Sequence, residues 1–449
     1  MQSPSHLNEH QRELDRGKRP DSIYSLRERY PDIPFEAIVK TDLLRLGIAF
    51  SPEALKVCAE AKPKSYFIFS FDRVAQEDLT PMERRAVPEE IALVGGPFDF
   101  KRTIVSVRVN PASPYRVETS PLSPLSLLRR GAGERSEKIA DIVLPSPPPY
   151  YAEPLSNGKP VADIAPTIEW GYLIYLTAFR LCQYWGAEEE CLFCDINENY
   201  RQQKAEGRSY TGIKSTDEII EALEIINKKD TGKISRAYTV TGGSVTKDLN
   251  GMTEAEFYAQ YARAIEARFP GRWIGKVVAQ ALPENEVRLL KDSGYQIYHP
   301  NYEVWDKRLF AALCPGKERY VGRDEWNHRI LAAAQIFGPE NVIPNFVAGI
   351  EMAKPHGFKT IDEAIVSTSE GLDYFMSQGI CPRFTVWCVE PNTELARTNA
   401  EPPPLEYYVR LLHVYREKFR RYKLPLPPGY GEAGLGKVVF SVSAFMDVL

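Results

Sequence analysis

Three cysteines lie within 13 residues of the chain: Cys182, Cys191 and Cys194. They follow an apolar run at residues 172–181 that is typical of a buried strand. Three thiolates at this spacing can bind three irons of a [4Fe–4S] cube and leave the fourth iron open to a ligand. Because a cube with four cysteine ligands usually carries only electrons, the pattern predicts an enzyme.

Two other interpretations of these cysteines stay open. The Cys191–Cys194 pair would also suit zinc, but a zinc site usually has a fourth Cys or His nearby, and no histidine lies between His10 and His299. Three unrelated buried cysteines are the second alternative, since cysteine is common in protein cores. The clustering of three of the seven cysteines favours the cube over both.

Composition limits the class of protein. The 449 residues are 43% hydrophobic and 26% charged, with a formal net charge of −4, which gives no bulk attraction to nucleic acid or to anionic membranes. No apolar run is long enough to span a bilayer, and the polar first 20 residues lack a signal-peptide core. Seven unevenly spaced cysteines argue against a disulfide framework. We therefore expect a cytoplasmic protein with no membrane span and no nucleic-acid partner.

The elements that must position the cysteines come after a proline-rich segment at residues 146–154. From there on, apolar strand-like runs alternate with amphipathic helical stretches. This alternation predicts a parallel sheet, open or closed as a barrel, with functional residues at the carboxyl ends of its strands. The expected strands are residues 172–181, 237–241, 273–281, 295–298, 342–347 and 384–389, and the clearest helices are residues 215–229, 253–269 and 285–294.

The cysteine region resembles the radical S-adenosylmethionine (SAM) superfamily, in particular the branch of biotin synthase, the hydrogenase maturases and the aromatic amino-acid lyases. The usual signature of that superfamily is Cys-x3-Cys-x2-Cys with an aromatic residue just before the third cysteine. Phe193 fills the aromatic position, and Cys191–Cys194 has the expected spacing. The first gap differs, because eight residues separate Cys182 from Cys191.

The resemblance implies a set of cofactor contacts. Residues 241–244 resemble the Gly-Gly-Glu segment whose backbone binds the SAM amino group, with a serine in place of the acid. Glu303 matches a glutamate that binds the amino group or the ribose, and Arg329 matches an arginine that binds the carboxylate. Residues 344–351 resemble the segment beside the adenine. The implied metal ligands are Cys182, Cys191 and Cys194, and the implied SAM contacts are Phe193, Thr241, Gly242, Gly243, Ser244, Glu303, Arg329, Val347, Gly349 and Ile350.

Three further residues are candidate catalytic groups near the expected mouth. Cys388 ends the sixth strand and could be a radical partner or a covalent relay, and Tyr298 and Tyr302 could relay a hydrogen atom. The structural alternatives are a small core residue for the cysteine and aromatic packing for the tyrosines. Cys314, Cys381 and Cys388 together are candidate ligands of a second cluster.

The resemblance also implies the fold and the activity. We expect an α/β protein with a partial, about six-stranded (β/α) TIM-type barrel at residues 166–449, a proline-rich linker at 146–165, and an added N-terminal α+β domain at 1–145 that could cover the barrel. The implied activity is reductive cleavage of SAM at a [4Fe–4S] cluster to a 5′-deoxyadenosyl radical, which abstracts hydrogen from a small or medium organic substrate in a biosynthetic pathway for a cofactor, pigment, lipid or natural product.

A low-potential flavodoxin or ferredoxin is the implied electron donor. The sequence does not indicate which reaction follows hydrogen abstraction: rearrangement, cleavage, hydroxylation, methylation or sulfur insertion. Two other functions stay open. One is a non-radical iron–sulfur lyase or hydratase that uses the open iron as a Lewis acid, and the other is a metal-binding scaffold without catalysis.

Overall fold

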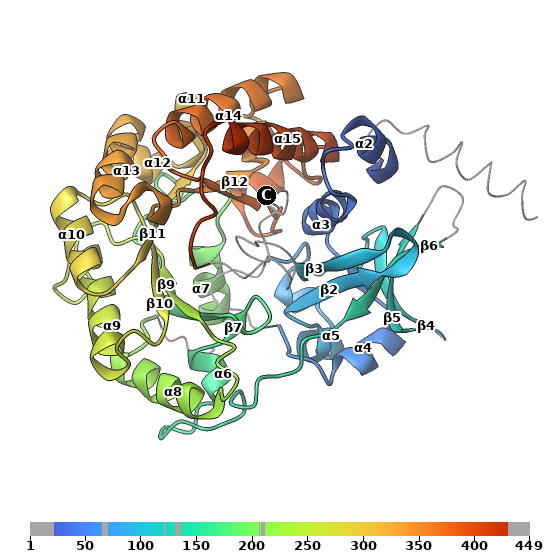
Figure 1. Cartoon of the computed structure of the whole chain (residues 1–449), viewed down its shortest axis with the longest axis horizontal. Coiled ribbons are helices and arrows are strands. Elements are labelled where there is room, and N and C mark those ends of the chain that lie inside the picture. The colour runs from blue at the N-terminus through green and yellow to red at the C-terminus, as the bar shows by residue number, and fades with distance from the viewer. Residues whose placement is uncertain are drawn as a thin grey trace, which may run out of the picture.

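The computed structural model describes residues 22–64, 71–120, 123–130, 136–205, 207 and 212–429. These residues form two sheets that lie side by side, as Figure 1 shows. None of the helices in these ranges combines the length and the apolar character needed to cross a bilayer.

The later part of the chain forms a curled sheet with the strand order β13-β12-β11-β10-β9-β8-β7. The edge strand β7 (Thr167–Ile168) is antiparallel to its neighbour, and the other strands are all parallel. In the described residues this confirms the predicted α/β class with a partial barrel of six parallel strands. These are β8 (Leu173–Phe179), β9 (Ala237–Gly242), β10 (Ile274–Ala279), β11 (Ile297–Glu303), β12 (Asn345–Ala348) and β13 (Arg383–Val386).

Helices surround the outer face of this sheet (Figure 1). Several begin at side-chain caps that the sequence provides: Ser215 accepts a hydrogen bond from the backbone of Glu218, and Thr253 and Thr360 each start a reciprocal capping box. The helices of this part of the chain, of which α7 does not lie on that outer face, are α6 (Val161–Ile164), α7 (Ile196–Ala205), α8 (Thr216–Lys229), α9 (Glu254–Arg268), α10 (Glu284–Asp292), α11 (Lys307–Leu313), α12 (Pro315–Tyr320), α13 (Arg323–Phe337), α14 (Ile361–Met376) and α15 (Leu405–Arg421).

One strand differs in an informative way from its prediction. The expected strand at residues 295–298 runs instead from Ile297 to Glu303. Its second half, HPNYE, is polar and contains a proline, so it lacks the apolar pattern by which a strand is recognised. Three of these residues, His299, Asn301 and Glu303, line a cavity inside the barrel.

The earlier part of the chain forms the N-terminal sheet, with the order β1-β4-β5-β6-β2-β3. It is antiparallel except for the short parallel pairing of β1 with β4. Its strands are β1 (Ala49–Phe50), β2 (Glu90–Gly95), β3 (Phe100–Ser106), β4 (Tyr115–Ser120), β5 (Ser123–Arg130) and β6 (Ser136–Val143), and its helices are α2 (Ile23–Arg29), α3 (Phe35–Leu46), α4 (Pro52–Cys58) and α5 (Pro81–Ala86).

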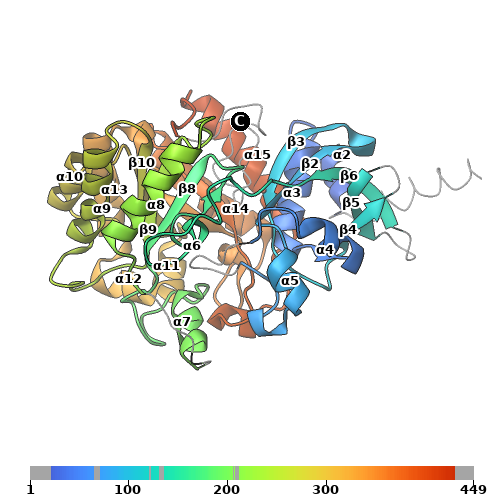
Figure 2. The ribbon, with the colours of Figure 1, turned by 90° about the horizontal axis from the view of Figure 1, so that it is seen from below.

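The N-terminal sheet and its helices contact both edges of the open barrel, and Figure 2 shows them beside it. At one edge the buried Arg108 donates a hydrogen bond to the carbonyl of Val386 on β13, at 2.7 Å. At the other edge the Glu90 carboxylate of β2 accepts from the backbone N–H groups of Glu169 and Trp170, each at 2.9 Å. The N-terminal part therefore closes the lateral opening between β13 and β7.

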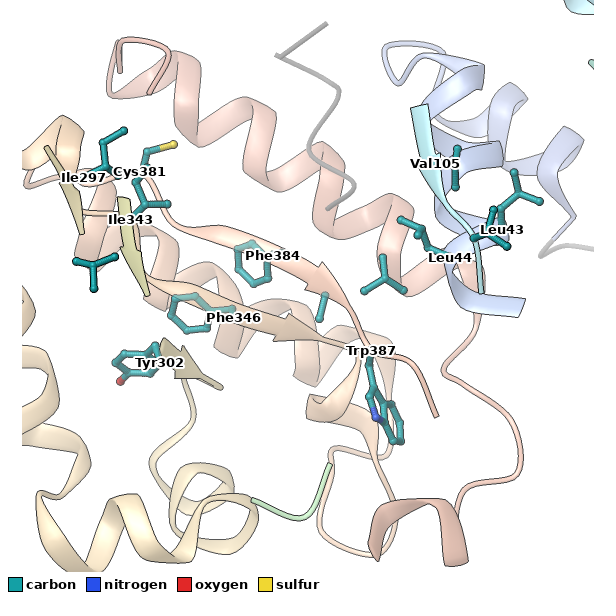
Figure 3. Close-up of a cluster of buried hydrophobic side chains, with 14 of the residues drawn as sticks. Leu43, Leu44, Val105, Ile297, Tyr302, Ile343, Phe346, Cys381, Phe384 and Trp387 are labelled. Carbon is teal, nitrogen blue, oxygen red and sulfur yellow. The ribbon is translucent and has the colours of Figure 1, made fainter. Parts of the chain in front are cut away.

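A continuous hydrophobic core joins the two parts. Figure 3 shows Leu43 and Leu44 of α3 near the end of β13. In the barrel part of the same core, the rings of Phe346 on β12 and Phe384 on β13 stack with centroids 5.2 Å apart. Because these side chains belong to one buried cluster, apolar burial stabilises the junction between the two parts as well as each part.

Candidate functional site

A cavity of about 260 Å³ lies inside the barrel. Residues from the carboxyl ends of the strands line one end of it, and four residues of the N-terminal part complete its wall. The N-terminal contributions are Lys64, Phe71, Glu89 and Ser106. The predicted site residues that line it are Cys182, Cys191, Cys194, Phe193, Thr241, Gly242, Gly243, Ser244, Glu303, Val347 and Cys388.

The cysteine loop between β8 and α7 is held by backbone and amide hydrogen bonds. The backbone N–H of Cys182 donates to the Asn197 side-chain oxygen at 2.9 Å, and the N–H of Cys194 donates to the carbonyl of Cys191 at 3.0 Å. The Asn197 amide in turn donates to the carbonyl of Tyr184 at 2.9 Å. These bonds bring the first cysteine and the later pair together although eight residues separate them.

Burial dominates the titration of the cysteine thiols. It raises the pKa of Cys182 to about 12, an effect that nearby Cys191 adds to and that backbone N–H donors from Ser244 and Tyr184 oppose. The pKa of Cys194 is also raised well above its usual value, first by burial and then by Cys191. N–H groups aimed at sulfur favour the thiolate form that iron requires.

The donor set fits an iron–sulfur cube. All seven cysteines are free thiols, and the three in the loop face one cavity. Within the described ranges, no three His, Cys, Asp or Glu side chains converge closely enough to hold a single metal ion. A cube distributes its cysteine ligands over separate irons, so it does not need sulfurs that meet at one point.

A buried cation lies beside the cysteines. The Lys317 ammonium is 2.5 Å from a carboxylate oxygen of Glu303 and also donates to the carbonyl of Asn301 at 3.0 Å. Its charge lowers the pKa of Cys182 and of Cys314, partly offsetting the effect of burial on these thiols. Lys317 was not predicted, because a lysine in a helical stretch has no sequence feature that distinguishes it from a surface residue.

The glycine pair at the end of β9 is required by close packing. A Cβ on Gly243 would lie 1.9 Å from the Leu181 carbonyl oxygen and 2.6 Å from the Cys182 Cα, and a Cβ on Gly242 would lie 2.4 Å from the Phe179 carbonyl oxygen. The two glycines therefore let the end of β9 pack directly against the end of β8, which carries the first cysteine. Both glycines also line the cavity.

Glu303 reaches the cavity through an irregularity in β11. Its φ is +85°, and the pairing of β11 with β12 shifts register between Asn301 and Glu303. Such a bulge re-aims a side chain next to a functional site. The carboxylate pairs with Lys317 at the same end of the cavity as the cysteines.

Three predicted SAM contacts do not reach the cavity. Arg329 lies on α13, where its guanidinium donates to Glu325 at 2.8 Å and to the carbonyl of Ala281 at 3.2 Å. Gly349 and Ile350 lie in the turn after β12, where the Gly349 N–H donates to Glu351 at 2.7 Å. A helix face and a tight turn direct these three residues away from the cavity lining, and their SAM contacts stay predictions.

The two candidate tyrosines also lie away from the cavity, and their catalytic role stays a prediction. Tyr298 and Tyr302 are fully buried outside the cavity lining, because side chains alternate along β11 and the intervening His299, Asn301 and Glu303 take the inner face. The Tyr298 hydroxyl accepts from the Leu282 N–H, and the Tyr302 ring stacks on Phe346 at 4.7 Å.

The remaining cysteines are separated from one another. Cys388 lines the cavity, and burial raises its pKa to about 12. Cys381 contacts the Tyr415 hydroxyl at 2.9 Å in the core. Cys314 lies within hydrogen-bonding reach of Cys191 and is fully buried. The structure therefore brings no second cluster together from these three, and it puts Cys314 next to the first.

The other end of the cavity holds charged and polar residues, which we call the polar floor: Glu169, Thr239, Lys276, His299, Asn345 and Arg383. Burial raises the pKa of Glu169 to about 7, against the attraction of Lys276 and Arg383. Burial and the same two cations lower the pKa of His299 well below its usual value, so the ring is neutral. A charged residue within an apolar strand, such as Lys276 in IGKVVA, is the sequence signal that could have indicated this floor.

Neither a protein-family model nor a curated protein matches the chain. Among solved structures, it is similar to methylornithine synthase (PylB), with 12% identity, a TM-score of 0.40, and coverage of 55% of this chain and 63% of that one. It is also similar to HydG, a maturase of the [FeFe]-hydrogenase, with 12% identity, a TM-score of 0.40, and coverage of 56% and 51%.

A third similar structure is coproporphyrinogen III oxidase (HemN) from Escherichia coli, described as a radical SAM enzyme. It has 11% identity, a TM-score of 0.34, and coverage of 56% of this chain and 52% of that one. The chain thus spans between 51% and 63% of the length of these three proteins. A similarity to solved structures at 11–12% identity assigns neither a substrate nor a reaction to this chain.

Proposed function

We propose that this chain is a radical SAM enzyme that takes a hydrogen atom from a small organic substrate in a biosynthetic pathway. The observation that carries the proposal is the gathering of Cys182, Cys191 and Cys194 with the Gly242–Gly243 wall and Glu303 at one end of an interior cavity. That end lies at the carboxyl ends of parallel strands, where barrel enzymes carry their chemistry.

When bound, a [4Fe–4S] cluster and SAM supply a 5′-deoxyadenosyl radical by reductive cleavage. Cys182, Cys191 and Cys194 would hold three irons, and the N–H donors at Cys182 stabilise its thiolate. Lys317 adds a buried positive charge next to these sulfurs, which favours an anionic cluster at this place.

The wall around the cysteines suits SAM. The backbone of residues 241–244 and the Glu303 carboxylate offer acceptors to an amino group, and Val347 offers an apolar surface to the adenine. The N-terminal residues that complete the wall would limit the access of water to the reacting centre. A low-potential flavodoxin or ferredoxin is the electron donor that this function requires.

The test is made on anaerobically purified protein whose cluster has been reconstituted. SAM and dithionite are added, and 5′-deoxyadenosine is measured by mass spectrometry together with iron per chain. The Cys191→Ala variant is expected to lose both cluster and product. Cys58→Ala, which removes a buried thiol from the N-terminal part, serves as the matched control and is expected to retain both.

Two results would contradict the proposal. One is full iron loading of Cys191→Ala, which would show that this thiol is not a ligand. The other is a reduced cluster with bound SAM that yields no 5′-deoxyadenosine alone or with the substrate candidates described below, which would favour the Lewis-acid alternative.

A further inference from the structure

The polar floor lies deeper in the barrel than the cysteine end. Thr239 precedes Gly242 by three residues on β9, which corresponds to about 10 Å along a strand. Asn345 and Arg383 are the first residues of β12 and β13, whereas Val347 and Cys388 come later on or after the same strands. One cavity therefore connects a cysteine end with a floor near the amino ends of the strands.

Several groups on the floor lack hydrogen-bond partners among the described residues. Both carboxylate oxygens of Glu169 are buried without a partner, and the residue is 6% exposed. The Nε of Arg383 and the hydroxyl of Thr239 are in the same state. Buried polar groups of this kind are satisfied by water or by a ligand, and leaving them unsatisfied is costly.

The turn that presents Glu169 is held in a strained conformation. Glu169 and Trp170 both have positive φ, at +57° and +58°. The Glu90 carboxylate of the N-terminal sheet fixes this conformation by accepting from both backbone N–H groups. Strain that the surrounding structure maintains in this way is often found where a side chain must be aimed at a ligand.

Glu169 and Arg383 are together complementary to a particular kind of molecule. Lys276 and Arg383 both attract Glu169, and no ion pair joins Glu169 to Arg383 in the described residues. A ligand between them would present an anionic acceptor to the guanidinium, which binds carboxylates through two parallel hydrogen bonds. The same ligand would present a donor to the carboxylate of Glu169.

Size and wall chemistry limit the rest of the molecule. The whole cavity measures about 260 Å³, and the cofactor end takes part of it. The wall between the floor and the cysteines includes Val278 and Val347, which suit a carbon skeleton. The substrate must therefore be small, with its polar end at the polar floor and its carbon chain directed toward the cysteines.

We propose that the polar floor binds a small carboxylic acid with a neighbouring ammonium or hydroxyl group, with the carboxylate on Arg383 and the donor on Glu169. An amino acid and a hydroxy acid share this chemistry. The inference rests on the proposed function, because it identifies this molecule as the one whose carbon faces the cofactor end.

The test is equilibrium dialysis of the full-length, cluster-loaded protein against a mixed panel, with mass-spectrometric detection, both with and without SAM. The panel contains the free 2-amino acids, the matching 2-hydroxy acids, their methyl esters and the amines that lack the carboxylate. Acids with a neighbouring donor are expected to be retained, and the esters and amines are expected to pass freely.

Variants locate the binding groups. Arg383→Gln is expected to weaken retention of every acid at least about tenfold, and Arg383→Lys is expected to restore part of it by returning the charge without the fork. Glu169→Gln is expected to weaken the binding of amino acids more than that of hydroxy acids. The substitution removes the negative charge that attracts an ammonium group, whereas the amide oxygen still accepts from a hydroxyl. Arg288→Gln, on the exposed face of α10, is the control and is expected to change nothing.

The outcomes separate this inference from the proposed function. Binding of SAM without retention of any panel member would overturn the inference alone, as would equal retention of esters and acids or unchanged acid binding by Arg383→Gln. Retention of acids by a protein that produces no 5′-deoxyadenosine with them would support the floor and contradict the radical chemistry. If the variants do not fold, the inference is still tested by whether the parent protein retains acids in preference to their esters.

Discussion

At the scale of single residues, Cys314 decides whether the proposed cube has three or four cysteine ligands. It lies beside Cys191, yet it does not line the cavity. If only the three loop cysteines bind iron, the fourth iron is open to SAM. If Cys314 also bound iron, the cube would carry four cysteine ligands and would be suited to electron transfer.

We predict that Cys314→Ser retains the iron content and visible absorption of the reconstituted parent protein. The physical reason is that, in the proposed function, Cys182, Cys191 and Cys194 would already provide the ligands at the cavity wall. Iron and sulfide analysis of Cys314→Ser beside Cys191→Ala checks this. A loss of iron as complete in the first variant as in the second would mean that four cysteines bind the cluster.

Single residues also show what the sequence can and cannot predict. Cys182, Cys191, Cys194 and the glycine pair were predictable, because their types and spacing carry their chemistry. Tyr298 and Tyr302 lie on the face of β11 that the cavity does not touch, which the sequence did not indicate because the expected strand stopped at residue 298. Glu169 and Arg383 are more than 200 residues apart in the sequence, so only the folded chain shows that they face one cavity.

At the scale of elements, the end of β9 is packed too closely against the end of β8 for any side chain. We predict that Gly243→Ala lowers the free energy of unfolding by about 3 kcal/mol, because its Cβ would overlap the Leu181 carbonyl and displace the loop that carries Cys182. Cluster loading should fall in parallel. Denaturant unfolding and iron analysis measure both effects.

Gly212→Ala is the matched control, because its Cβ would meet the Leu181 side chain at an ordinary 3.5 Å. Its free energy of unfolding should change by no more than about 1 kcal/mol. Equal behaviour of the two variants would show that the strand ends can separate without loss, contrary to the packing described here.

The turn after β12 contains a buried acid whose ionisation opposes folding. Burial raises the pKa of Glu351 to about 7 from an unfolded value near 4.5, although the Gly349 N–H and other donors oppose the shift. An acid with a raised pKa in the folded state contributes stability that is complete below the unfolded pKa and is lost as the pH rises through the folded pKa.

We therefore predict that the stability of the parent falls relative to Glu351→Gln as the pH rises from 4.5 to 7.5. The linkage limit for this shift is about 3 kcal/mol. Urea unfolding of both proteins across this range checks the sign. Gln and the protonated acid are alike in charge, so a difference that stays constant with pH would contradict the raised pKa.

At the scale of the whole molecule, the N-terminal part and the barrel form one structure. Arg108 is fully buried between them and donates to the carbonyls of Leu44 and Val386 at 2.5 and 2.7 Å. The core that Figure 3 shows runs through the same junction. The fold class and most barrel strands were predictable from the alternating pattern, but the closing role of the N-terminal part was only suggested, because its sequence contains no motif for it.

We predict that Arg108→Met destabilises the protein by about 3 kcal/mol, because two buried carbonyls lose a charged donor. Differential scanning calorimetry should also resolve the single transition of the parent into two, as the parts become less strongly coupled. The exposed Arg85→Met should behave like the parent to within about 0.5 kcal/mol. An unchanged single transition for Arg108→Met would show that this contact does not couple the parts.

The position of the closing part in the chain has a consequence for biosynthesis. Domains generally fold in the order in which they leave the ribosome, the N-terminal one first. Here the residues that seal the barrel emerge early, and the edge strand they seal, β13, emerges only after Arg383. Until β13 docks, the wall of the cavity is incomplete on this side, so the three cysteines stay accessible from it during synthesis.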